Sequence, residues 1–102
     1  MIHVIAVITA KPGQRDSLLG HFHANIPAVR AEKGCIEYGV AIDADTDLRI
    51  QTKYGSDCVL VVEKWDGVEA LKAHGAAPHM VAFSGKTKEL VASRAIHILQ
   101  PA

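Results

Sequence analysis

The 102-residue chain is predicted to form a single α+β domain, in which helices cover one face of a four-stranded antiparallel sheet. Three observations predict this class. Apolar stretches of strand length alternate with stretches of helical periodicity, glycine and proline separate the two kinds, and the length supports one hydrophobic core but not two. The expected order of elements is β-α-β-β-α-β, within one domain that occupies residues 1–102.

The first strand and the first helix follow from a change of period. Residues 2–10 are apolar or β-branched with hardly any polar interruption, which predicts a strand. A helix is predicted for residues 14–31, because apolar side chains recur there on one helical face: Leu18, Phe22, Ile26 and Val29. Pro27 lies inside this helix and is expected to kink it or to divide it near Asn25.

Two further strands are predicted around a long connection. Residues 32–34 form a glycine-type helix stop, and in residues 35–43 every second residue is apolar, which predicts the second strand. Residues 44–57 are polar and rich in Asp and Thr, so they are expected to form a long hairpin excursion. The β-branched run at residues 59–65 predicts the third strand.

The last part of the chain predicts a second helix in two pieces. Asp66 and Glu69 have the spacing of a capping box that opens a short helix, and Gly75 is expected to close it. Pro78 suits the first turn of another helix, and residues 94–99 form the last predicted strand. This order is the split β-α-β arrangement of ferredoxin-like domains.

Alternation along the strands predicts which side chains share a face of the sheet. One face is expected to be almost purely apolar: Ile2, Val4, Ala6, Ile8, Leu60, Val62, Ile96 and Ile98. A monomer rarely exposes so large an apolar face, so a second copy of the chain is expected to cover it and form a homodimer. The other face mixes apolar and polar residues: His3, Ile5, Val7, Val61, Glu63, Trp65, Ala95, His97 and Leu99. It is expected to face the helices, where polar groups line a cleft.

Charge and composition argue against several classes of partner. Lys and Arg total 11, as do Asp and Glu, and the charges are interspersed, so neither nucleic acid nor a membrane surface is an expected partner. No apolar run has the length of a membrane span, and the first residues lack the basic flank of a signal peptide, which predicts a cytoplasmic protein. Cys35 and Cys58 begin successive antiparallel strands, too far apart to pair, and are predicted to be reduced.

The candidate site gathers around Trp65, at the end of the third strand. His74 and His79 flank the break between the two helical pieces and are expected to converge with Trp65 on one cleft. Glu63 shares the face of Trp65, and Asn25 lies near the inward stripe of the first helix, where a polar side chain needs a partner or a ligand. Each residue also has an ordinary structural interpretation, as a packing anchor, a helix cap or an ion-pair partner. Their combination favours a site.

Metal and nucleotide chemistry are not expected. No two histidines have the helical spacing, with an accompanying carboxylate, of a dedicated metal site. Glycine-rich phosphate-binding motifs and a GxSxG nucleophile motif are absent. The sequence therefore predicts a site that holds no metal and no other cofactor.

Several segments together carry a resemblance to a known family. They are Val7-Ile8-Thr9-Ala10-Lys11-Pro12-Gly13, Glu32-Lys33-Gly34-Cys35-Ile36-Glu37-Tyr38, Glu63-Lys64-Trp65, and Glu69-Ala70-Leu71-Lys72-Ala73-His74 with Pro78-His79. In this order, and nearly end to end, the chain resembles the antibiotic biosynthesis monooxygenase domain and is similar to the quinol monooxygenases. The resemblance implies a dimeric α+β barrel of two sheets face to face, with a ligand cleft between sheet and helices in each subunit.

The resemblance also implies a chemistry. Family members include oxygenases that use neither metal nor flavin, in which an electron-rich phenol or quinol is deprotonated and itself reduces dioxygen. By this likeness Trp65 would stack on the aromatic substrate and Asn25 would hold a substrate oxygen. His74 or His79 would accept the phenolic proton, and Phe22 would help to wall the cleft.

The chain departs from the family pattern at three positions. Polyketide-oxidising members carry an Asn four residues before the motif Trp and a Tyr six residues after it, where this chain has Val61 and Leu71 in the expected cleft wall. Haem-degrading relatives need an Asn on the first strand, where this chain has Ala6. The expected substrate is therefore a small quinol or a related aromatic.

Two other functions remain open at the level of sequence. The first is an isomerase similar to family members that process the autoinducer-2 signal, acting on a small polar or phosphorylated sugar-like metabolite. The second is a non-catalytic dimer that binds a ligand, because one fold supports many functions. An apolar cleft favours an aromatic substrate, whereas two or more inward-facing basic groups favour a phosphorylated one.

Overall fold

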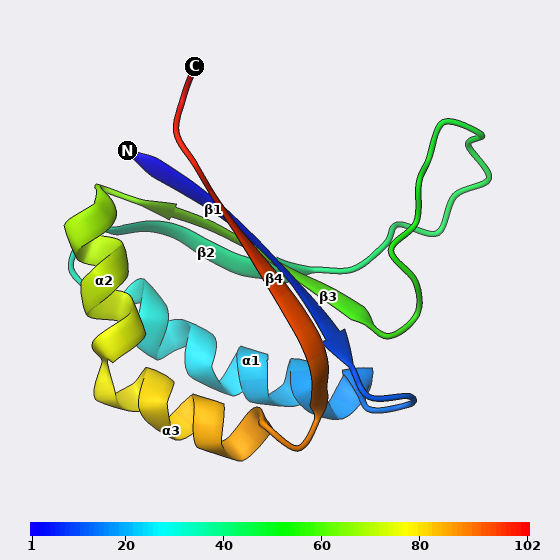
Figure 1. Cartoon of the computed structure of the whole chain (residues 1–102), viewed down its shortest axis with the longest axis horizontal. Coiled ribbons are helices and arrows are strands. Elements are labelled where there is room, and N and C mark those ends of the chain that lie inside the picture. The colour runs from blue at the N-terminus through cyan, green and yellow to red at the C-terminus, as the bar shows by residue number, and fades with distance from the viewer.

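The computed structural model describes all 102 residues and confirms the α+β class (Figure 1). The elements in chain order are β1 (Ile2–Ala10), α1 (Arg15–Arg30), β2 (Cys35–Ala41), β3 (Cys58–Trp65), α2 (Val68–Ala76), α3 (Pro78–Thr87) and β4 (Val91–Leu99). The four strands form one antiparallel sheet in the ferredoxin-like order β2-β3-β1-β4. All three helices lie on the same side of this sheet. None of them has the length and hydropathy needed to cross a membrane.

Helix α1 supplies one wall of the core. Its buried residues are those of the predicted apolar stripe: Leu18, Phe22, Ile26 and Val29. Pro27 lies inside α1, yet the helix runs unbroken to Arg30, so the expected division near Asn25 does not occur. The proline sits in the last turn, where its missing N–H removes a single hydrogen bond close to the helix end. Its carbonyl still accepts a bond from the Ala31 N–H, at 3.2 Å.

Gly34 lets α2 pack closely against the turn that follows α1. Its φ of +84° favours glycine, and a Cβ added there would lie 2.6 Å from the Cβ of Ala70. The Gly34 carbonyl also accepts the Asp66 N–H, at 2.9 Å. The expected capping box at the start of α2 does not form, because extended Gly67 is the N-cap and no side chain caps the helix. Gly34 therefore lets α2 lie close to the residues that immediately precede Gly34 in the chain.

The strand register corrects the predicted faces of the sheet. Val4 lies opposite Glu63 on β3 and opposite Ile98 on β4. Residues directly opposite one another point to the same face, so Val4 and its neighbours at every second position face the helices. The prediction that the apolar set of β1 and β4 lies on the uncovered face is wrong. The expected pairing of β1 with β3 differs from the observed one by one residue, and a difference of one residue places every side chain on the opposite face.

The uncovered face of the sheet remains apolar, although other residues form it. The central part of this face carries the apolar residues Ile5, Val7, Leu60, Val62 and Ala95, with His97 among them and Leu99 toward one end. None of them is fully buried in the single chain. The homodimer through the uncovered face stays a prediction, and the residues that would form its interface are these rather than the set expected from the sequence.

The helices cover the two edges of the sheet, strands β2 and β4, to different extents. Helix α1 packs over β2, and α3 packs against α1 rather than over the opposite edge strand β4. Ile96 and Ile98 of β4 point to the helix side but stay 55% and 57% exposed. The helix layer is therefore open along β4. Residues 42–57 project from the sheet as the predicted excursion and contain no strand (Figure 1).

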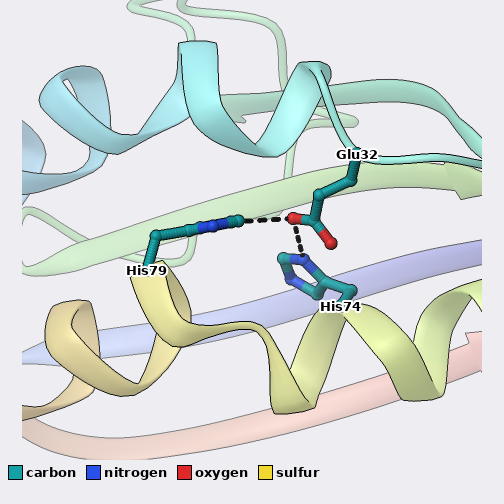
Figure 2. Close-up of side chains that lie close together, drawn as sticks. All are labelled: Glu32, His74 and His79. Carbon is teal, nitrogen blue, oxygen red and sulfur yellow. Dashed lines mark hydrogen bonds and ion pairs between the residues drawn. The ribbon is translucent and has the colours of Figure 1, made fainter.

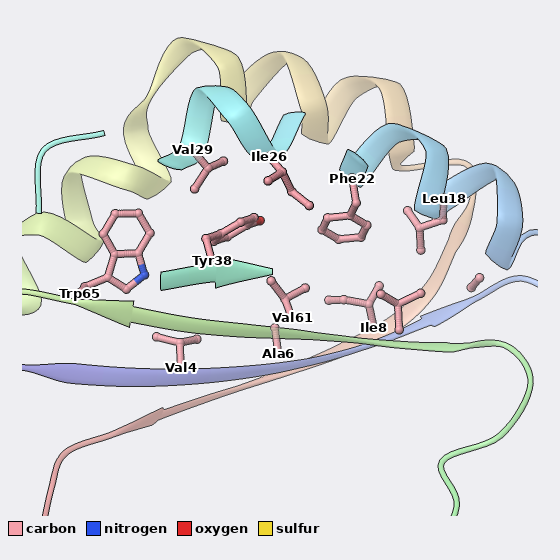
Figure 3. Close-up of a cluster of buried hydrophobic side chains, with 12 residues drawn as sticks. Val4, Ala6, Ile8, Leu18, Phe22, Ile26, Val29, Tyr38, Val61 and Trp65 are labelled. Carbon is pink, nitrogen blue, oxygen red and sulfur yellow. The ribbon is translucent and has the colours of Figure 1, made fainter. Parts of the chain in front are cut away.

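The core lies between α1 and the covered face of the sheet (Figure 3). It contains the inward residues of β1 and β3 together with the α1 stripe: Val4, Ala6, Ile8, Ala10, Val59, Val61, Trp65, Tyr38, Leu18, Phe22, Ile26 and Val29. Cys35 and Cys58 are both free thiols, as expected from their separation along the strands.

Candidate functional site

A cavity of about 610 Å³ lies between the covered face of the sheet and the helices. Most of its lining is apolar, and Phe22, Val61 and Leu71 contribute to its walls, where the sequence placed them. Glu63 and His74 also line it. Ile96 and Ile98 line the cavity and are more than half exposed, which places an opening beside β4. The volume and the apolar walls suit a small ring-shaped ligand.

His74 joins the cavity to a carboxylate behind it. The ring extends from α2, and its Nδ1 lies 2.8 Å from Oε2 of Glu32 in the turn after α1. A carboxylate only accepts hydrogen bonds, so Nδ1 carries the proton and donates it. No hydrogen bond pairs Nε2 with a protein group, Nε2 is not sealed from solvent, and His74 lines the cavity, so the second nitrogen of the ring is free to bond a ligand. An imidazole oriented by a carboxylate is suited to accept a proton.

His79 shares the same carboxylate oxygen (Figure 2). Its Nε2 lies 2.9 Å from Oε2 of Glu32, so two rings from α2 and α3 donate to one atom. The backbone makes this convergence possible at Ala77, whose extended conformation ends α2 before Pro78 starts α3. His79 does not line the cavity. It holds Glu32 from outside the cavity lining.

Trp65 is a packing residue behind the site. Its side chain is 0% exposed, and it does not line the cavity. The indole lies against His74, with ring centroids 4.6 Å apart and planes at 37°, and its Nε1 donates to Oε1 of Glu63 at 2.9 Å. Because the indole is fully enclosed, a ligand could stack on it only by displacing neighbouring side chains. The indole therefore supports His74 and Glu63 from behind.

Glu63 and Tyr38 supply the other polar groups of the cavity. Burial raises the pKa of the Glu63 carboxyl above its ordinary 4.5, and this effect outweighs the Trp65 N–H and neighbouring His74, which lower it. Burial also raises the pKa of the Tyr38 phenol, and the nearby Glu63 charge adds to the rise. The Tyr38 ring packs 5.6 Å from the His74 ring. Its hydroxyl has no protein partner and is not sealed from solvent, so it is free to bond a ligand.

Replacement of Glu63 by Gln is expected to stabilise the fold at neutral pH and to have little effect near pH 4. Because the pKa of Glu63 is raised on folding, its contribution to stability is fully present below the ordinary pKa and is lost as pH rises through the folded pKa. A glutamine keeps an acceptor for the Trp65 N–H without the buried charge. Urea unfolding at both pH values measures the effect, and a Gln variant less stable than the native chain at pH 7 would contradict it.

Asn25 does not line the cavity. Its Nδ2 donates to the sulfur of Met80 at 3.2 Å and so links α1 to α3. Lys88 and Arg94 line the part of the cavity formed by the end of α3 and by β4. The cavity therefore has mostly apolar walls, Glu63 and His74 among its polar groups, and two basic residues that are not expected there from the sequence.

The sequence reasoning also missed Glu32 and Tyr38. In the sequence Glu32 belongs to a helix stop, and its partners follow 42 and 47 residues later in the chain. In the sequence Tyr38 belongs to the apolar alternation of a strand. The signal that could identify it is a phenol on the strand next to that of Glu63, since Tyr38 and Glu63 are directly opposite one another.

The fold and the site together define a ferredoxin-like α+β domain with a largely apolar cavity and a carboxylate-bound imidazole in its wall. Residues 1–86 match the family described as Antibiotic biosynthesis monooxygenase. The Escherichia coli K12 protein named Probable quinol monooxygenase YgiN is 36% identical over 103 residues, covering 99% of this chain and 98% of the relative. The chain belongs to the antibiotic biosynthesis monooxygenase family.

Solved structures show the same architecture. PA3566 from Pseudomonas aeruginosa is 28% identical with a TM-score of 0.82, and covers 99% of this chain and 93% of its own. Rv0793 from Mycobacterium tuberculosis is 26% identical with a TM-score of 0.81, and covers 99% of this chain and 94% of its own. The fold assigned to the chain is therefore that of solved proteins along almost its whole length.

Proposed function

We propose that the protein is a monooxygenase that oxidises a small quinol or a related aromatic with dioxygen, in a reaction that needs neither metal nor flavin. The observation that carries the proposal is His74, whose Nδ1 is bound to Glu32 and whose Nε2 is available to the apolar cavity. The name of the Escherichia coli relative, Probable quinol monooxygenase, supports the substrate class.

In the proposed reaction His74 accepts a phenolic proton at Nε2. The positive charge that forms on the ring is stabilised by Glu32, which holds the Nδ1 proton at 2.8 Å. The phenolate is electron-rich and reduces dioxygen directly. One oxygen atom enters the ring and the other leaves as water, so the substrate supplies four electrons and becomes a hydroxylated quinone.

Glu63 and Tyr38 have positioning roles in this proposal. A carboxyl with a raised pKa is a ready hydrogen-bond donor or acceptor for a substrate oxygen, and the Tyr38 phenol stays protonated and donates. Phe22 and Leu71 bracket the ring between apolar surfaces. His79 acts through Glu32, and Asn25 acts through the packing of α3, rather than by touching the substrate.

Oxygen consumption tests the proposal directly. EDTA-treated protein is given a panel of reduced quinols and naphthols, and uptake is corrected for their spontaneous oxidation. The expected result is uptake that depends on the protein, with a product that gains one atom from isotopically labelled dioxygen. If no member of the panel shows protein-dependent uptake, the oxygenase proposal is contradicted.

One observation favours the second candidate, an isomerase of a phosphorylated sugar-like metabolite. Lys88 and Arg94 both line the cavity, and two basic groups are what a phosphate requires. Calorimetry with a sugar phosphate and with the matching unphosphorylated sugar separates the two candidates. Binding that depends on the phosphate and is lost in an Arg94→Gln variant would favour the isomerase, whereas binding of quinols alone favours the oxygenase.

We also propose that the uncovered sheet face mediates a homodimer. Its centre carries Val7, Leu60 and Val62, which a monomer would leave against water. Two such faces packed together would form the dimeric barrel that the family resemblance implies.

Replacement of Leu60 by Lys is therefore expected to convert the dimer into a monomer. A charge buried between two sheets has no partner there, and its desolvation opposes association. Sedimentation velocity at micromolar concentration measures the change. Val68→Lys places the same charge on the exposed side of α2 and is the control that should stay dimeric. A native chain that sediments as a monomer would contradict the proposal.

A further inference from the structure

Three metal-ligating side chains from separate parts of the fold meet at one place (Figure 2). Glu32 lies in the turn after α1, His74 in α2 and His79 in α3, and one ligand atom from each lies within 4.8 Å of the other two. This is the one place in the chain where three such groups come together. The shared contact is Oε2 of Glu32, at 2.8 and 2.9 Å from the two ring nitrogens.

We propose that Glu32, His74 and His79 form a binding site for a divalent first-row transition-metal ion, with zinc as the best match. Two imidazole nitrogens and one carboxylate oxygen are a ligand set that zinc uses when a water completes its coordination. Calcium and magnesium prefer oxygen ligands and are disfavoured by two nitrogens. The carboxylate also supplies a negative charge to a largely enclosed site.

The present distances require only a small adjustment to admit an ion. Zinc lies about 2.0–2.2 Å from nitrogen and oxygen ligands, so tetrahedral ligands are roughly 3.3 Å from one another. The two N–O contacts at 2.8 and 2.9 Å would open slightly, and the two rings would close on the ion. The side chains of His79 and Glu32 are 29% and 14% exposed, so solvent reaches the site and a water can take the fourth position.

Metal binding would change the chemistry of His74. The ion replaces the proton on Nδ1, so a neutral ring must carry its proton on Nε2, the nitrogen available to the cavity. That nitrogen would then donate a hydrogen bond and could no longer accept a proton. The ion would therefore inhibit proton abstraction by His74. This consequence rests on the proposed function, whereas the metal site itself does not.

Calorimetry with zinc chloride tests the site without any measurement of turnover. The tag-free chain is stripped with EDTA and titrated at neutral pH. We expect one ion per chain, at least tenfold weaker binding in the variants Glu32→Gln and His79→Gln, and weaker binding of the native chain as pH falls, because protons compete for the ligands. His23→Gln is the control, since His23 is exposed on α1 and lies outside the site.

Visible absorption of the cobalt(II) form gives a second measurement that does not depend on a stable variant. Cobalt bound by two histidines and a carboxylate absorbs more intensely than the hydrated ion, so an intense spectrum that saturates at one equivalent is expected. The proposal is overturned if the native chain shows no saturable binding, if both variants bind zinc as well as the native chain, or if cobalt keeps the spectrum of its hydrated form. Because no substrate is present, this failure is distinct from failure of the oxygenase proposal.

Discussion

The His74→Gln variant is expected to lose turnover of quinols by a factor of about 10² to 10⁴. A glutamine fills much of the same space beside Trp65 but has no basic nitrogen to accept the phenolic proton. The remaining rate should increase with pH, because hydroxide then replaces the missing base and ionises the substrate. Oxygen uptake in EDTA-treated samples measures both effects.

The matched control for this variant is His23→Gln. His23 is exposed on α1 and does not line the cavity. Its replacement should leave the intrinsic rate per active site unchanged. Turnover within twofold of native in His74→Gln, with the fold intact by circular dichroism, would remove His74 from the reaction. Partial loss in Glu32→Gln would agree with an orienting role for that carboxylate.

The Trp65→Ala variant is expected to lose about 3–5 kcal/mol of unfolding free energy. The indole is 0% exposed, stacks against His74 and donates to Glu63, so its removal leaves a cavity and an unpaired buried acceptor. Because a domain of this size has a marginal total stability, the variant should unfold at much lower urea concentration. Equilibrium urea unfolding followed by circular dichroism measures this loss.

A Phe at the same position separates the two contributions of Trp65. Trp65→Phe keeps most of the packing but removes the N–H donor to Glu63, so it should cost clearly less than the Ala variant. Truncation of the exposed Val68 to Ala is the control and should change stability by less than about 0.5 kcal/mol. A loss below about 1 kcal/mol in Trp65→Ala would contradict the packing role.

The elements of the fold were predictable from local patterns, and the faces of the sheet were not. Residues 2–10 form the strand that their composition predicts, and Pro78 starts α3 as its missing N–H permits. The two faces of β1 are both apolar, so alternation does not distinguish the set that contains Val4 from the set that contains Ile5. Only the pairing of β1 with β3 decides between them, and that pairing is a tertiary property.

The candidate site was predictable in part for the same reason. His74, Glu63 and Phe22 line the cavity, because helical and strand periodicity point them toward the core. Glu32 could not be found by periodicity, since it lies outside any regular element and meets His74 only after α2 packs against Gly34. Trp65 shows the opposite difficulty, because its type suggests a ligand contact while neighbouring side chains enclose it completely.

The corner at Ala77 determines where the chain tolerates a change in length. In one continuous helix, His74 and His79 would point about 140° apart, because each residue advances by roughly 100°. The corner alone directs both rings to one oxygen, so even a single inserted residue between them would separate the pair. The outer part of the excursion, residues 44–53, carries no such constraint, since it projects from the sheet away from the helices, whereas Gly55 and Asp57 are bonded to Arg15 and Gly13. Natural insertions and deletions should therefore accumulate in the excursion and be excluded from the corner.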